Sequence, residues 1–293
     1  MAKRHIILAL ALLCAGAFTY QTYAADKPAK SKDLGLSLEV GADVVSSYLW
    51  RGYNLGGLSI QPSVTLDWKG LYLCGWGNIG ADNWKFQEIN PELDITIGYD
   101  NYGLKLDLTH LYYFGGSKYF MGLGDANNAF SESTMELHAG IDAGEWTKIV
   151  PLTIDWYTTV LGYDPVFDEN GNVVINANGN AKRAYSTYIE LGYDFALGEN
   201  WQLDARVGMT PAKSLYTGYQ GDFAVTLVGL KLNKSWELGA VEAKGERREA
   251  GRLNAFAHLM LQPWQVTKDN LILPIGQAGG QKLNLAVGLQ WSI

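Results

Sequence analysis

The chain has 293 residues and a formal net charge of −7 at pH 7, and it carries 34 Gly, 17 Tyr and 10 Trp. An acidic chain without clustered lysine and arginine does not suit nucleic-acid phosphates, so the composition argues against a nucleic-acid partner. Beyond the N-terminal region no segment reaches the ~18 consecutive apolar residues of a membrane-spanning helix, which excludes a helical membrane protein.

The first residues have the three parts of a secretory signal. Lys3 and Arg4 form a charged start, and an apolar run follows over 6–18. Thr22 and Ala24 then place small residues at the positions that a signal peptidase reads. The apolar run is shorter than the ~20 residues that a spanning helix needs, so we expect cleavage rather than anchoring.

Cleavage divides the chain into a signal peptide over 1–24, a short polar linker over 25–33 and one domain over 34–293. The net charge then becomes −9, because the removed segment holds one lysine, one arginine and no acid. Cys14 follows a leucine, where a lipid-attachment site has a small residue, so a lipoprotein is not expected. Cys74 is the remaining cysteine, which excludes an intramolecular disulfide.

From residue 34 onwards apolar and polar residues alternate with the period of two that is typical of strands, and helical periodicity does not return. In chain order the alternation predicts strands at 34–44, 58–68, 71–79, 93–99, 104–108, 135–141, 152–156, 185–195, 201–209, 222–232, 253–261 and 283–293. About twelve antiparallel strands is an even number, as transmembrane up-and-down β-barrels of bacteria have. We therefore predict an all-β chain that forms such a barrel.

The final strand shows the pattern without interruption. Its apolar positions are Leu283, Leu285, Val287, Leu289, Trp291 and Ile293, and small or polar residues separate them. Its length matches the ~9–11 residues with which a tilted strand crosses a bilayer. An aromatic residue near an apolar end resembles the closing strand of outer-membrane barrels, which the barrel-assembly machinery recognises.

Short and long connections alternate along the chain, as they do between the two sides of an outer-membrane barrel. The short connections are 68–70, 100–103, 143–148 and 197–200. The long connections are 80–91, 115–132, 164–183, 211–221 and 263–282. Asn170-Gly171 predicts a small hairpin inside one long loop. The charged segment 237–252 is too long for a short turn, and a further strand pair there would raise the count to fourteen.

Aromatic residues gather at both predicted strand ends, where lipid headgroups would favour rings with a polar tip. Beside the short connections lie Trp68, Tyr99, Tyr102, Trp146, Trp201, Trp236 and Trp291. Beside the long connections lie Trp50, Tyr53, Trp84, Tyr112, Tyr163, Tyr185 and Trp264. We interpret these two sets as aromatic girdles.

The run Val44-Val45-Ser46-Ser47-Tyr48-Leu49-Trp50-Arg51-Gly52 ends the first predicted strand, and Gln61-Pro62-Ser63-Val64 and the Gly-rich run 70–77 follow it. This arrangement, over residues 34–80, resembles the TorF-type porin family of outer-membrane β-barrels. The resemblance implies an outer-membrane porin of a Gram-negative bacterium with no defined substrate.

The faces opposite the apolar positions define the predicted lumen. Its acids are Glu39, Asp43, Asp67, Asp94, Asp107, Glu136, Asp142, Asp155, Glu190, Asp194 and Asp204, and its bases are Arg51, Lys105 and Arg206. Such an excess of acids gives a negative potential that favours cations over anions. The acids could equally pair with the bases and fill a narrow interior.

Arg51 is expected to follow the inward face of the first strand near the outer rim. Its guanidinium could bind an anionic group or a loop, or form a salt bridge to a lumen carboxylate. His110 is expected to face outward near a strand end, as the histidine of an outer-membrane lipid hydrolase does, whereas His138 and His258 point inward. No serine lies beside His110 on its strand.

The composition and pattern lead us to expect a passive outer-membrane channel for small hydrophilic solutes, without enzymatic activity, catalytic residues, cofactor or metal. Its partners would be outer-membrane lipid and lipopolysaccharide, small hydrophilic solutes and the barrel-assembly machinery. A structural or adhesive barrel that presents the long loops is the alternative, and a lipid hydrolase is a weaker one. The loop 168–172 suits a hairpin turn better than a calcium site.

Overall fold

The computed structural model describes residues 35–81, 92–113, 133–162, 164–243, 246–249, 251–264 and 283–293. The predicted signal peptide, the linker and most of the long connections 80–91, 115–132 and 263–282 lie outside the described residues. Among the described residues no helix is long and apolar enough to cross a membrane.

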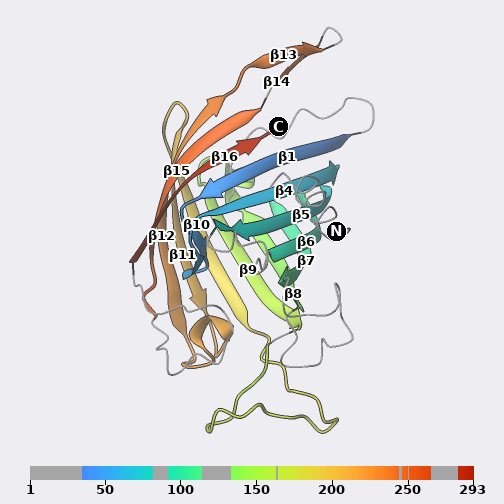
Figure 1. The fold of residues 1–293 in the computed structure, drawn as a ribbon, viewed down its shortest axis with the longest axis vertical. Coiled ribbons are helices and arrows are strands. Elements are labelled where there is room, and N and C mark those ends of the chain that lie inside the picture. Colours follow the sequence, from blue (N-terminus) through green and yellow to red (C-terminus); the bar gives the residue numbers. More distant parts are fainter. Residues whose placement is uncertain are drawn as a thin grey trace.

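Twelve antiparallel strands close into one barrel (Figure 1). They are β1 (Leu36–Val45), β4 (Ser59–Trp68), β5 (Leu71–Gly80), β6 (Glu92–Asn101), β7 (Leu104–Tyr113), β8 (Ser133–Asp142), β9 (Leu152–Leu161), β10 (Thr187–Gly198), β11 (Trp201–Thr210), β12 (Ala224–Glu237), β15 (Arg252–Leu261) and β16 (Leu283–Ser292). The predicted fold class and the twelve predicted strands are confirmed.

The last strand closes the ring, as its alternation predicts. β16 pairs with β1 from Gly41↔Ser292 to Val45↔Gly288, and Val40 and Ile293 exchange two backbone hydrogen bonds of 2.9 and 2.7 Å. Each strand therefore has a neighbour on both sides, which removes the open edge that would otherwise invite aggregation.

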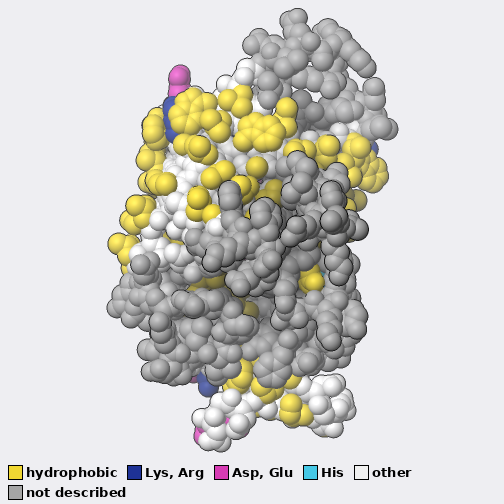
Figure 2. Space-filling view, viewed as in Figure 1, with side chains coloured by type: hydrophobic (Ala, Val, Ile, Leu, Met, Phe, Trp, Pro, Cys, Tyr) yellow, Lys and Arg dark blue, Asp and Glu magenta, His cyan; other side chains and the backbone are white. Residues whose placement is uncertain are grey.

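The outer face of the barrel is apolar. Every barrel strand contributes an exposed apolar side chain to it, namely Leu38, Leu66, Leu73, Ile97, Leu106, Leu137, Trp156, Leu191, Val207, Leu230, Leu259 and Leu285. On β16 Leu285 is 62% exposed while its neighbour Ala286 is 2% exposed, so the period of two separates the two faces. Figure 2 shows such hydrophobic side chains on the outer surface.

The charged segment 237–252 contains a separate hairpin. β13 (Ala240–Ala243) and β14 (Glu246–Glu249) pair only with each other within the described chain, so they do not enlarge the barrel. The hairpin projects from the end of the barrel that carries the short turns (Figure 1). The alternative of a fourteen-stranded barrel is therefore wrong. Below we call this the short-turn end and the opposite one the loop end.

A second small hairpin, β2 (Tyr48–Trp50) and β3 (Tyr53–Gly56), lies in the connection between β1 and β4 at the loop end. Arg51 and Gly52 form its turn, both with positive φ (45° and 97°). A Cβ on Gly52 would lie 2.1 Å from the carbonyl oxygen of Thr226, so the turn abuts β12. Arg51 therefore does not follow the face of the first strand, because β1 ends at Val45.

Aromatic side chains at the short-turn end are exposed, as a girdle requires. They are Trp68, Tyr99, Tyr102, Trp146, Trp201, Trp236 and Trp291. At the loop end Tyr185 is exposed, but Tyr53 and Tyr112 are buried, and Trp50 packs against a buried tyrosine cluster. The predicted loop-end girdle is thus wrong for these three residues, and its members Trp84 and Tyr163 lie outside the described residues.

Candidate functional site: the barrel interior

Thirteen of the fourteen predicted lumen residues occupy strand positions that alternate with the exposed apolar ones. They are Glu39, Asp43, Asp67, Asp94, Lys105, Asp107, Glu136, Asp142, Asp155, Glu190, Asp194, Asp204 and Arg206. Arg51 reaches the interior from the β2–β3 turn instead. The alternation along the strands thus places thirteen of the predicted residues in the interior, whereas Arg51 is placed there by the β2–β3 turn.

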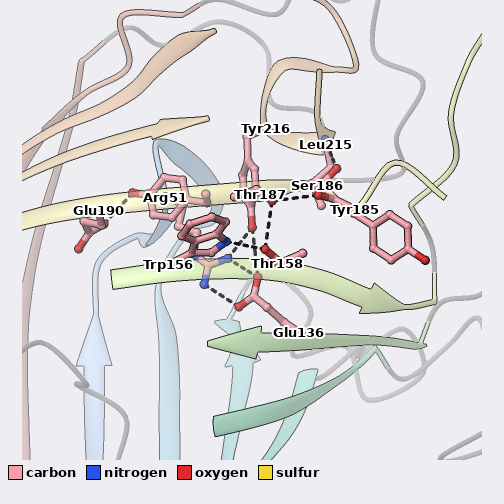
Figure 3. A network of polar contacts seen from close by, with 11 residues as sticks. Arg51, Glu136, Trp156, Thr158, Tyr185, Ser186, Thr187, Glu190, Leu215 and Tyr216 are labelled. Carbon is pink, nitrogen blue, oxygen red and sulfur yellow. Dashed lines mark hydrogen bonds and ion pairs between the residues drawn. The ribbon is translucent and has the colours of Figure 1, made fainter. Parts of the chain in front are cut away.

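Arg51 forms a clamp across the loop-end half of the interior (Figure 3). Its Nη1 and Nη2 donate to Oε2 and Oε1 of Glu136 on β8, at 2.5 and 2.7 Å. Nη1 also donates to the hydroxyl of Tyr216 at 2.5 Å. The guanidinium carbon lies 3.8 Å from the ring centre of Tyr157, with Trp50 and Tyr188 also within reach. A bidentate pair stacked on an aromatic ring fixes the guanidinium in one orientation.

A tyrosine cluster surrounds this clamp. It consists of Tyr53, Tyr188, Leu215, Tyr216 and Tyr219, and it joins the β2–β3 hairpin to η3 (Leu215–Thr217) and to β10. The hydroxyl of Tyr53 donates to the backbone oxygen of Tyr216 at 2.6 Å. Tyr188 and Tyr216 are fully buried, so the hairpin and η3 together narrow the interior at this level.

A histidine bridges two acids nearer the short-turn end. His138 Nδ1 lies 2.8 Å from Asp107 Oδ2, and its Nε2 lies 2.9 Å from Asp155 Oδ1. Both carboxylates can accept a hydrogen bond from this ring at once only when it is an imidazolium, which donates from both nitrogens. Tyr72 donates to Asp107 at 2.7 Å. These contacts bring together two acids that the sequence placed only on a common face.

A second set of charges lies on β10 to β12. Arg206 Nη1 is 2.6 Å from Asp194 Oδ1, and its Nε is 3.8 Å from Glu190 Oε1. Asp204 accepts from Asn233 at 2.8 Å and lies opposite Lys231 in the strand register. The predicted bases are thus each paired with an acid, since Lys105 Nζ also lies 3.7 Å from Asp107.

Five inward-facing charged residues were missed by the sequence interpretation: Glu92, Asp100, Lys231, Glu237 and Arg252. Lys231 is buried, lies opposite Asp204 and His258, and places its ammonium 4.3 Å from the Phe256 ring. The alternation of Val228, Leu230 and Leu232 around it was a signal that could have found it. With these additions fourteen acids face five bases among the described strand residues and Arg51, so acids remain in excess.

Two predicted lumen acids serve the short turns. Asp142 caps the short helix α2 (Ala143–Thr147) and accepts from the amide of Gly144 at 2.8 Å. Asp67 accepts from the amide of Gly70 at 3.2 Å. Asp43 accepts from Gln290 at 3.0 Å across the closing seam, and Glu39 lies within electrostatic range of Arg252.

The long connection between β9 and β10 carries an ordered network at the loop end. Asp164 accepts from the amide and hydroxyl of Ser186 at 2.7 and 2.5 Å and from the hydroxyl of Tyr219 at 3.1 Å. The Ser186 hydroxyl accepts from the amide of Leu215 at 2.8 Å, which joins this connection to η3. Burial raises the pKa of the Asp164 carboxyl, and the hydrogen bonds from Ser186 and Tyr219 oppose that rise.

Two turns of the same construction follow in this connection. Asp168 Oδ1 accepts from the amides of Asn170 and Asn172, and Asn176 Oδ1 accepts from the amides of Asn178 and Asn180. Phe167 pairs with Val173 around the first turn, which confirms the hairpin predicted at Asn170-Gly171. The backbone hydrogen bond from Asn172 holds the pKa of Asp168 below its usual value.

His110 occupies an outward-facing position of β7, as expected. Its direct cross-strand neighbours are Ile95 and Met135, and its ring stacks 6.3 Å from Tyr112. Neither strand neighbour provides a nucleophile. His138 and His258 occupy inward positions, as expected.

Comparison with known proteins gives similarity of structure alone. No family model and no curated protein matches the chain, so the resemblance to the TorF-type porin family has no support beyond the residues that suggested it. Solved structures that match include "NanC porin structure in rhombohedral crystal form", at 9% identity and a TM-score of 0.43, covering 88% of this chain and 99% of that one.

Two further matches are "Salmonella typhi OmpF complex with Daunomycin" and "Crystal structure of a Pseudomonas aeruginosa FadL homologue". They have 10% identity each, with TM-scores of 0.36 and 0.32. Both cover 88% of this chain, and they are covered over 97% and 73% of their own lengths. At such scores the likeness carries no argument, so function rests on the residues themselves.

Proposed function

We propose that the protein is an outer-membrane channel through which small hydrophilic solutes diffuse passively, with cations favoured over anions. One observation carries the proposal: a closed barrel exposes apolar side chains on every strand outside and holds an excess of carboxylates inside. In this proposal the protein lies in the outer membrane, where its outer face contacts lipid and lipopolysaccharide. The barrel-assembly machinery would recognise β16.

The outer face supports a membrane location. Exposed apolar side chains scattered singly are normal on soluble proteins, but a belt that continues around twelve strands is far larger than the apolar patches they tolerate. A closed barrel is also the β-architecture that leaves no backbone group unpaired in lipid. The short-turn end would then face the periplasm, and the loop end would face outside.

The inner face supports passage of cations. The interior carries more acids than bases, and acids that are not neutralised attract counter-ions from water. The Arg51 clamp and the tyrosine cluster narrow the loop-end half, so we expect a small unitary conductance rather than that of a wide pore. The bases lie beside acids rather than in a separate stripe, which leaves no continuous positive path among the described residues.

Planar-bilayer recording with purified protein tests the proposal. We expect discrete current steps and, under a KCl gradient, a reversal potential of the sign that cation selectivity gives. Glu190→Gln keeps an acceptor for the Tyr188 hydroxyl but removes a charge, so it should reduce the cation preference. Glu199→Gln, at an exposed short turn, is the matched control. Absence of current steps, or anion selectivity, contradicts the proposal.

An adhesive barrel is the second candidate, because the connection 162–186 projects from the loop end (Figure 1) with two equivalent, well-bonded turns. Deletion of 166–182 separates the two functions. An adhesin would lose its binding, whereas a channel would retain discrete current steps. For a lipid hydrolase, whose test is lipid hydrolysis lost in His110→Ala, the described strand neighbours of His110 provide no support.

A further inference from the structure

Three inward-facing side chains form a row across β4, β5 and β6. Ser63 lies directly opposite Trp76, and Trp76 lies directly opposite Asp94. Side chains that are directly opposite in an antiparallel pair have Cβ atoms about 4.5–5.5 Å apart, so the three can contact one small molecule. Ser63 is 1% exposed and Trp76 is 6% exposed.

Each member of the row has a buried polar atom without a hydrogen bond. Ser63 Oγ, Trp76 Nε1 and Asp94 Oδ1 have no partner among the described residues, and neither does Ser59 Oγ at the beginning of β4. A buried polar atom without a partner costs stability, and most such atoms in native proteins are satisfied. Three of them side by side in one row indicate a place where a ligand provides the missing partners.

The charge around this row is negative. Asp94 lies within electrostatic range of Glu92, Glu136 and Arg51. This group therefore holds three acids and one base, and the base, Arg51, is already bound bidentately to Glu136. A ligand that enters here is therefore favoured if it carries positive charge.

We infer that this row binds a small hydroxylated amine, such as an amino alcohol or an amino sugar. The ammonium group donates to Asp94, an oxygen of the ligand accepts from Trp76 Nε1, and a hydroxyl exchanges a hydrogen bond with Ser63. Tyr48 packs against Trp76 with ring centres 5.6 Å apart, which holds the indole in place. The inference deepens the proposed function, because it names the class of solute that the cation-favouring interior would retain.

Isothermal titration of the purified protein in detergent tests the site without requiring conduction. The probes are glucamine, which is protonated at neutral pH because a primary alkyl amine has a pKa of about 10, and sorbitol, which replaces the amine by a hydroxyl. N-acetylglucamine keeps the polyol chain and the nitrogen but removes the charge, with an acetyl group added. We expect glucamine to bind at least about tenfold more tightly than either neutral probe, as a charge-assisted hydrogen bond predicts.

Two variants test the assigned roles. Asp94→Asn should remove the preference for glucamine over sorbitol, and Trp76→Phe, which keeps an aromatic ring beside Tyr48, should weaken glucamine binding by about tenfold. Asp168→Asn is the control, because the twin turn already uses Asn176 at the equivalent position. Folding of each variant is checked by heat-modifiable gel mobility, and Ser63→Ala replaces any variant that does not fold.

Equal binding of the three probes, no binding of glucamine, or an unchanged Asp94→Asn profile would overturn the inference, because water alone would then satisfy these atoms. The outcome is separable from the channel proposal. A protein that conducts cations but ignores glucamine has the channel without this site. A protein that binds glucamine in detergent but shows no current has the site without the channel.

Discussion

At the scale of single residues, glycines allow bulky side chains to lie flat across the inner wall. A Cβ on Gly208 would lie 2.0 Å from the hydroxyl of Tyr188, and a Cβ on Gly98 would lie 2.4 Å from Cβ of Asp107 and 2.8 Å from the hydroxyl of Tyr72. Tyr188 can therefore cross from β10 towards β11, and Tyr72 can reach Asp107. At these two positions the missing glycine side chain leaves the space that a neighbouring tyrosine ring occupies.

Glu136 is the acid that holds Arg51 in the interior, so its charge should control the β2–β3 hairpin. Glu136→Gln keeps one acceptor oxygen but removes the charge and one of the two hydrogen bonds. Breaking one partner of a buried ion pair costs roughly 3–5 kcal/mol, less where water reaches it. We expect more frequent current fluctuations and a larger mean conductance in bilayer recordings. Glu199→Gln should leave both unchanged, and a silent Glu136→Gln would show that Arg51 does not position the hairpin.

Asp164 should make the loop-end contact sensitive to pH. Its pKa is raised by burial, so the closed connection binds a proton more readily than an opened one with an ordinary carboxyl. Stability of the contact is then complete below the ordinary pKa of about 3.9 and falls as the pH rises through the raised pKa. We expect the protection of the Ser186 amide, corrected for intrinsic exchange, to fall over this range.

The control for that measurement is Asp164→Asn, which keeps an acceptor oxygen but does not titrate. Its Ser186 protection should be independent of pH in the same range. Protection that rises with pH in the unmodified protein would contradict the stated direction of the pKa change.

At the scale of elements, the β2–β3 hairpin depends on the close approach of its turn to β12. Gly52→Ala adds a Cβ 2.1 Å from the Thr226 carbonyl oxygen at a positive φ, so the turn must retreat from β12. Gly171→Ala is the matched control, because Gly171 also has a positive φ (79°) but nothing within 4 Å. The left-handed backbone costs both variants about 1–2 kcal/mol locally. We expect a conductance increase in Gly52→Ala alone, and equal behaviour of the two would contradict this role.

The elements differ in how far sequence could predict them. The barrel strands follow from alternation, because one face meets an apolar surround and the other a polar interior. β9 extends to Leu161, whereas the prediction ended it at Trp156. The prediction stopped early because Thr158 interrupts the alternation of apolar residues on the outer face. The β2–β3 hairpin was not predicted, since its inward path depends on contacts with Glu136 and Thr226, which are distant in sequence. Pairing partners of this kind leave no local pattern.

The same limit applied to the candidate site. Parity placed Asp94 and Glu136 on one inner face, but the sequence did not show that Arg51 would pair with Glu136. The row of Ser63, Trp76 and Asp94 depends on the register of two strand pairs. A register becomes known only when the neighbouring strands are placed, although the residue types were visible from the start.

At the scale of the whole molecule, the ring and the two faces depend on each other. Closure of the ring gives the backbone N–H and C=O groups of every strand a hydrogen-bond partner. It also separates the two faces of the sheet, so that the outer face can meet lipid while the inner face surrounds a polar interior. The apolar belt therefore predicts more than location. The free-energy cost of placing a charged side chain in it must depend on how deep in the bilayer that side chain lies. A soluble barrel would show no such dependence.

Two arginine substitutions measure that depth dependence. Leu137, exposed near the middle of β8, should lie in the hydrocarbon, whereas Leu197, exposed at the short-turn end of β10, should lie near the headgroups. Leu137→Arg should destabilise folding into lipid vesicles by about 2–4 kcal/mol, and Leu197→Arg by about 0–1 kcal/mol. Urea-dependent folding into vesicles gives both values. Equal costs for the two variants would mean that no bilayer surrounds the belt, because in water both arginines would be solvated alike.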